Sequence, residues 1–181
     1  MKTELTTKIL INRNPEAVFD YIADIESDVH WRNGVISMKQ STRGYTDLTS
    51  VQDEVLTLFG KTFRIKAIVT RYVHNSGYSF RIFKGIPGLT GYRKVQNVDG
   101  NTLFTYSVCM VANPFLSVLL FPLKLIFIKR FQSDLKRLKY ILEKVNKKPE
   151  EKIYRMPKLV QVAQTIIFNV FGRSVFVPES D

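Results

Sequence analysis

The sequence predicts an α+β domain in which a curved antiparallel sheet of six to seven strands surrounds a long C-terminal helix. Residues 35–112 are a succession of alternating apolar and polar segments separated by turn residues, and no helical pattern interrupts them. One Asn-Pro pair precedes this stretch and another follows it, and each pair is typical of a helix start. Strands that follow one another without a crossover helix pair antiparallel.

The chain begins with a predicted strand and two short helices. Residues 4–12 alternate in polarity, as a half-buried strand does. Asn14 then supplies a side chain that can cap a helix, and Pro15 fits the first helical position. These residues predict a helix over 15–24, and a second small helix follows at Trp31.

Turn residues divide the central stretch into strands. We expect one strand to end near Gly44 and the next near Gly60, and a turn at Asn75-Ser76-Gly77 follows the strand over residues 61–73. Asp99-Gly100 is the strongest hairpin signal, because both residue types tolerate the positive φ that a two-residue turn requires.

A second helix start at Asn113-Pro114 opens the longest helical pattern of the chain. Apolar residues then recur at spacings of three and four, which predicts a helix with a continuous apolar stripe to about Val145. Residues 115–128 are apolar on almost every side but are too few to cross a bilayer. We therefore expect this part of the helix to be buried.

A C-terminal extension, residues 148–181, follows the predicted domain of residues 1–147. Its apolar side chains predict an amphipathic helix over about 158–171, with glutamine, threonine and asparagine on the polar face. A membrane-surface helix usually carries lysine and arginine on that face. We therefore expect the helix to pack on protein, either as a lid over the domain or across a homodimer.

Composition limits the chemistry of the chain. One cysteine excludes an intramolecular disulfide, and two histidines with one cysteine argue against a dedicated zinc site. No glycine-rich phosphate loop is visible, so we predict neither a metal nor a cofactor. The N-terminal residues contain no apolar run of signal-peptide length, which predicts a cytoplasmic protein.

The net charge of +11 is concentrated on the predicted long helix. Residues 114–147 carry 8 basic and 2 acidic side chains. A basic helix can contact an anionic membrane surface or ribosomal RNA. The simpler interpretation is a solvated outer face, and we expect no sequence-specific DNA binding.

Four segments carry a resemblance to a known family: residues 9–24 (ILINRNPEAVFDYIAD), Trp31, Thr105-Tyr106-Ser107 and residues 135–143 (LKRLKYILE). They resemble the SRPBCC superfamily, which includes START and Bet v 1-like proteins, and in particular its polyketide cyclase and lipid-transport branch. The resemblance covers roughly residues 4–146 and implies the helix-grip fold. It implies no single function, because members include lipid and hormone carriers, cyclases and ribosome-associated proteins.

When a curved sheet closes on a helix with bulky side chains, the space between them is not easily filled. Aromatic side chains on the concave face of the sheet then line a cavity. We therefore predict an apolar cavity, large enough for a drug-sized ligand, between the sheet and residues 116–131. For each wall residue the alternative is plain core packing. The predicted walls are Trp31, Phe63, Tyr78, Phe80, Tyr92, Phe104, Tyr106, Leu120, Leu123 and Phe127.

The leading hypothesis is the binding or transport of an apolar small molecule, such as a lipid, an isoprenoid or a polyketide-like compound, without catalysis. One alternative is a cyclase or dehydratase that uses the same cavity. Asp53 and Glu54 are adjacent in a predicted strand, so one carboxylate must point inward, and these are the first catalytic candidates. A salt bridge to Arg64 or Arg81 would explain an inward carboxylate equally well. The other alternative is an interaction module whose basic helix binds the ribosome or an anionic membrane.

Overall fold

The computed structural model describes residues 2–41, 46–85, 88–111 and 114–144, with the backbone alone for residues 2, 111 and 114–123. The predicted extension, residues 148–181, and its helix over 158–171 lie outside the described residues and stay predictions. In chain order the elements are β1 (Lys2–Ile11), α1 (Pro15–Ala23), the 3-10 turn η1 (Ile25–Ser27), α2 (Asp28–Trp31), β2 (Val35–Gln40), β3 (Val51–Leu58), β4 (Lys61–Val73), β5 (Gly77–Lys84), β6 (Leu89–Val98), β7 (Asn101–Val111) and α3 (Pro114–Glu143).

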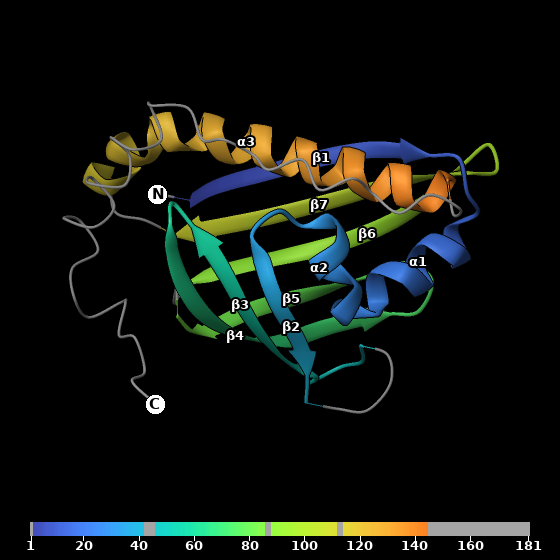
Figure 1. The fold of residues 1–181 in the computed structure, drawn as a ribbon, viewed down its shortest axis with the longest axis horizontal. Coiled ribbons are helices and arrows are strands. Elements are labelled where there is room, and N and C mark those ends of the chain that lie inside the picture. The colour runs from blue at the N-terminus through green and yellow to red at the C-terminus, as the bar shows by residue number, and fades with distance from the viewer. Residues whose placement is uncertain (1, 42–45, 86–87, 112–113, 145–181) are drawn as a thin grey trace.

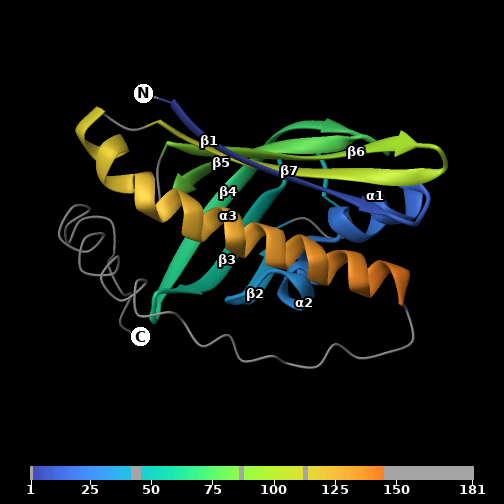
Figure 2. The same ribbon diagram turned by 90° about the horizontal axis from the view of Figure 1, so that it is seen from above.

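The strands form one antiparallel sheet of seven strands in the order β1-β7-β6-β5-β4-β3-β2. Each strand from β2 to β7 pairs with its neighbour in sequence, and β1 completes the sheet beside β7. The sheet curls around α3, which lies along β1, while α1 and α2 cover the same concave side (Figures 1 and 2). The predicted curved antiparallel sheet around a long C-terminal helix is confirmed.

Local sequence signals place the start of α1 and the last hairpin as predicted, whereas β2 ends at Gln40 and not near Gly44. The side chain of Asn14 accepts a hydrogen bond from the backbone N–H of Ala17 at 2.9 Å, and Pro15 occupies the first turn of α1. Between β6 and β7, Asp99 and Gly100 have φ values of 51° and 79°, as a two-residue hairpin with positive φ at both positions requires.

Two apolar clusters form the core of the described residues. The first joins α1, α2, β7 and the C-terminal half of α3, and its fully buried members include Phe19, Trp31, Phe104, Leu135 and Leu138. The second joins η1 to strands β2 to β5. Among the described residues, no helix combines the length and the apolar character that a membrane span needs.

The turn between α2 and β2 is fastened to α3 and to β3. The backbone N–H of Asn33 donates to Asp134 at 2.9 Å, and Arg130 donates to the carbonyl of Asn33. Thr57 donates its N–H to the carbonyl of Gly34 at 2.6 Å. Gly34 has a φ of 81°, and a Cβ there would lie 2.5 Å from the Thr57 carbonyl and 2.6 Å from the Arg130 side chain. This position therefore requires glycine.

We expect the substitution Gly34→Ala to lower the free energy of unfolding by at least about 2 kcal/mol, because a left-handed φ and a backbone clash act together. The matched control is Gly100→Ala, where φ is 79° but no atom lies within 4 Å of the added Cβ. Urea unfolding of both variants measures the difference. Equal losses would show that the close approach at Gly34 contributes nothing.

Candidate ligand-binding cavity

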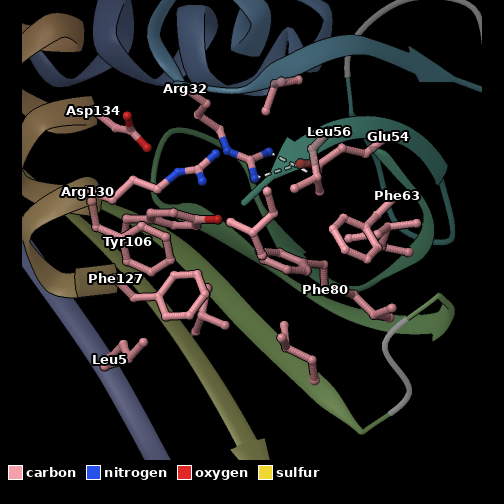
Figure 3. Close-up of a pocket in the computed structure, with 18 of the residues that line it drawn as sticks. Leu5, Arg32, Glu54, Leu56, Phe63, Phe80, Tyr106, Phe127, Arg130 and Asp134 are labelled. Atoms are coloured by element: carbon pink, nitrogen blue, oxygen red, sulfur yellow. Dashed lines mark hydrogen bonds and ion pairs between the residues drawn. The ribbon is translucent and has the colours of Figure 1, made fainter. Parts of the chain in front are cut away.

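A cavity of about 240 Å³ lies between the concave face of the sheet and α3 (Figure 3). Ligand pockets usually measure about 300–1,000 Å³, so this cavity is smaller than the drug-sized space that we predicted. Most of its wall is apolar and comes from β3, β4, β5, β7 and α3, with Leu56, Phe63, Ile65, Phe80, Val108 and Phe127 among the lining residues.

Four of the predicted wall residues line this cavity: Phe63, Phe80, Tyr106 and Phe127. The predicted walls Leu120 and Leu123 lie on α3, but their side chains are outside the described residues.

The other four predicted wall residues do not line the cavity. Trp31 and Phe104 are fully buried in the core, where their rings pack edge to face with centroids 6.3 Å apart. Tyr78 is also buried and donates its hydroxyl to the carbonyl of Ile22 at 3.2 Å. Tyr92 lies on the opposite face of β6 from the buried Arg93, because successive side chains of a strand alternate between faces.

The catalytic candidates Asp53 and Glu54 lie on opposite faces of β3. Glu54 lines the cavity, and both its oxygens accept hydrogen bonds from Arg32, at 2.8 and 3.1 Å. Asp53 points to the outer face, where it is 42% exposed and pairs with Lys66 at 3.1 Å. The partner of Glu54 is thus an arginine beside α2 rather than a strand arginine, and the ion pair holds Glu54 against one wall.

A chain of buried ion pairs connects the sheet to the helices. Arg93 of β6 donates to both oxygens of Asp28, the first residue of α2, with one distance of 2.8 Å. Arg93 also donates to the carbonyl of Ile22, near the end of α1, at 3.2 Å. Asp28 in turn accepts from Arg32 at 3.1 Å, and Arg32 bonds to Glu54. Each of these four charges has an opposite charge beside it, as burial requires.

Aromatic rings surround the Arg93 guanidinium. Its central carbon lies 5.2 Å from the Trp31 ring centroid, 5.6 Å from that of Tyr78 and 5.5 Å from that of Tyr106. These distances allow cation–π attraction, which strengthens where water is excluded. This explains why Trp31 and Tyr78 belong to the core: they pack around a buried cation.

Asp134 and Arg130 of α3 line the cavity beside Arg32 (Figure 3). Burial raises the pKa of Asp134 to about 6, although the Asn33 N–H and the nearby Arg130 lower it in part. Burial lowers the pKa of Arg130 and raises that of Tyr106. Asp134 is therefore a cavity carboxyl that changes its protonation state near neutral pH.

Glu54 and Tyr106 are polar residues of this wall that the sequence predicted, whereas Gln52, Arg93, Arg130 and Asp134 were not predicted. On β3, Gln52 shares a face with Glu54 and the buried Leu56, and on β6 Arg93 shares a face with Val95, so strand alternation could have identified Gln52 and Arg93. The spacing of four between Arg130 and Asp134 indicates only that they share a side of a helix.

The described residues contain no group of three or more histidine, cysteine, aspartate or glutamate side chains that could hold a metal ion. The polar residues of the cavity can bind, orient or exchange a proton with a ligand.

No protein-family model and no curated protein matches the sequence. Solved structures do match the fold. The crystal structure of TTHA0849 from Thermus thermophilus aligns with a TM-score of 0.66 and 17% identity, over 80% of this chain and 100% of that one. The di-domain ARO/CYC protein StfQ from the steffimycin biosynthetic pathway aligns with a TM-score of 0.64 and 11% identity, over 80% of this chain and 52% of that one.

A plant protein shares the fold as well. The major latex-like protein 151 from Panax ginseng aligns with a TM-score of 0.60 and 11% identity, over 78% of this chain and 97% of that one. The fold is the helix grip of the Bet v 1-like and SRPBCC proteins. The fold that the resemblance implied is thus confirmed, and identities this low establish nothing beyond it.

We expect Asp28→Asn to lower the free energy of unfolding by about 3–5 kcal/mol, because it leaves Arg93 buried without its counter-charge. Glu26→Gln is the matched control, since Glu26 is an exposed acid close before it in the chain and should cost at most about 0.5 kcal/mol. Urea unfolding at pH 7 measures both. A cost below about 1 kcal/mol for Asp28→Asn would contradict a structural role for the pair.

Asp134 should make stability depend on pH. Its pKa is about 6 in the folded chain against an ordinary value of 3.8, so between these pH values the folded state binds more protons than the unfolded state. The stabilisation that this protonation supplies is complete below about pH 4 and is lost as the pH rises through about 6. The loss is on the order of 3 kcal/mol.

The substitution Asp134→Asn keeps an oxygen for the Asn33 N–H but cannot ionise. We therefore expect this variant to gain stability relative to the parent as the pH rises from about 4 to about 7. Urea unfolding at several pH values measures the difference, with the exposed Asp20→Asn as control. A difference that stays constant with pH would contradict the raised pKa of Asp134.

Proposed function

We propose that this protein binds or transports an apolar small molecule, such as a lipid, an isoprenoid or a polyketide-like compound, without changing it chemically. The observation that carries the proposal is the cavity of about 240 Å³ with a largely apolar wall. An empty apolar cavity destabilises the folded protein, because the side chains around it lack van der Waals contacts on one side. A ligand of matching shape supplies these contacts.

Related folds support a small-molecule role. The StfQ structure is that of a protein from a biosynthetic pathway, and it shares this fold. The same cavity could therefore serve a cyclase or dehydratase, and Asp134 favours this second candidate. A buried carboxyl with a pKa of about 6 can donate or accept a proton near neutral pH. We favour binding, because the other cavity carboxylate, Glu54, is held in an ion pair with Arg32.

We propose that residues 1–147 form the binding domain and act in the cytoplasm, and that residues 148–181 cover it or join two copies. Lys129 and Lys136 are exposed on α3, which keeps peripheral contact with the ribosome or another anionic surface as an alternative.

Native mass spectrometry of the freshly purified chain tests for a co-purified ligand, and the neutral fluorescent probe N-phenyl-1-naphthylamine tests for binding directly. We expect the probe to bind, and we expect Val108→Trp to weaken it about tenfold or more, because the indole occupies the cavity that Val108 lines. Circular dichroism checks that the variant is folded.

Val98→Trp is the matched control, because Val98 is 38% exposed at the end of β6 and does not line the cavity. This variant should bind the probe as the parent does. If both tryptophan variants reduce fluorescence equally, the probe binds elsewhere. If the parent binds neither this probe nor a co-purified molecule, the proposed function is wrong.

A further inference from the structure

The cavity lining has hydrogen-bonding capacity that the described protein does not use. Gln52 of β3 lines the cavity and is only 4% exposed, yet its side-chain nitrogen has no hydrogen-bond partner among the described residues. A buried amide without a partner destabilises the empty protein. Gln52 is therefore an unused donor in the lining of the cavity.

Two further donors line the cavity. Figure 3 shows the hydroxyl of Tyr106 pointing into the cavity, with the Arg130 guanidinium beside the Tyr106 ring. Both residues line the cavity. Arg130 donates to the carbonyl of Asn33, and a guanidinium carries five N–H groups in all. The ligand group that fits these donors is a hydrogen-bond acceptor.

The charge of the lining favours an acceptor that is negative. Four basic side chains, Arg32, Arg93, Lys124 and Arg130, line the cavity together with two carboxylates, Glu54 and Asp134. Asp28 pairs with Arg93 and Arg32, which leaves one more basic than acidic side chain. Both lining carboxylates already accept hydrogen bonds, from Arg32 and from the Asn33 N–H.

Arg130 is the basic group in this lining that a ligand would best complement. Burial lowers its pKa most, Asp134 and Glu54 raise it, and the charge of Arg32 lowers it. Desolvation thus disfavours the positive charge of Arg130 in the empty cavity. An anionic oxygen beside it would stabilise it in a place that water solvates poorly.

The end of the cavity away from Arg130 is apolar. Figure 3 shows Phe63, Phe80 and Leu5 away from Arg130 and Asp134, whereas Phe127 lies close to Arg130 on α3. The cavity therefore has a polar end and an apolar end, and a ligand that matches it has the same division.

We propose that the ligand is an amphiphile with a carboxylate head. The carboxylate lies against Arg130, Tyr106 and Gln52, and the apolar chain extends toward Phe63 and Phe80. This inference rests on the proposed function, because it specifies what the same cavity binds.

The experiment uses the full chain and three probes that share one chain length and differ in the head: decanoic acid, decan-1-ol and decylamine. Each probe displaces bound N-phenyl-1-naphthylamine at about pH 8, where the acid is ionised. We expect decanoate to act at a concentration about tenfold lower than decanol, because a charge-assisted hydrogen bond is stronger than a neutral one. Decylamine should be the weakest, because its charge repels Arg130.

Two variants locate the head. Arg130→Met should raise the concentration of decanoate needed for displacement about tenfold and leave decanol unchanged. Lys129→Met is the matched control, since it removes the same charge from the adjacent, exposed position of α3 and should change neither. Gln52→Leu should weaken decanoate binding and raise the urea midpoint of the ligand-free chain, because it removes an unpartnered buried amide.

The outcomes separate the two proposals. If the naphthylamine probe binds but decanol displaces it as well as decanoate does, the carboxylate head is wrong and cavity binding stands. Equal effects of Arg130→Met and Lys129→Met would overturn the placement of the head at Arg130. If no probe binds, both the proposed function and this inference are wrong.

Discussion

The ion pair between Asp28 and Arg93 connects the helical part of the molecule to the centre of its sheet. Arg93 lies on β6, inside the sheet, and its guanidinium reaches both the start of α2 and the carbonyl of Ile22 near the end of α1. Two short helices that could not be stable alone thereby gain a fixed position. Trp31 and Tyr78 then pack around the same cation and close the core above it.

The same bonds shape the cavity. Arg32 is held by Asp28 and Glu54, so one polar wall is already ordered before any ligand arrives. Asp134 and Arg130 hold the turn that follows Arg32 through the backbone of Asn33. A site whose side chains are positioned by the fold loses less conformational entropy on binding. Stability and recognition therefore depend here on one set of contacts.

The fold could be predicted because its element boundaries depend on neighbouring residues in the sequence. The polar residues of the cavity could not all be predicted, because their positions depend on contacts between distant residues. The cap at Asn14 and the hairpin at Asp99-Gly100 act between near neighbours, so the residue types reveal them. The bond from Arg93 to Asp28 joins residues 65 positions apart, and no periodicity encodes such a pairing. The prediction that Trp31 lines the cavity was wrong for the same reason. A large, buried aromatic side chain can line a cavity or pack around a buried cation, and its residue type does not distinguish the two.

The position of β1 has a consequence for how the chain reaches this structure. Its register with β7 runs from Lys2 opposite Val111 to Ile11 opposite Thr102, so the first strand finds its partner only after nearly all of the sheet has been synthesised. Pairing β1 with β7 closes a much longer loop than a hairpin does, so it costs more conformational entropy. Such non-local pairing slows folding. During synthesis on the ribosome, β1 therefore stays unpaired until β7 has been made. Until then its free edges can pair with strands of other chains.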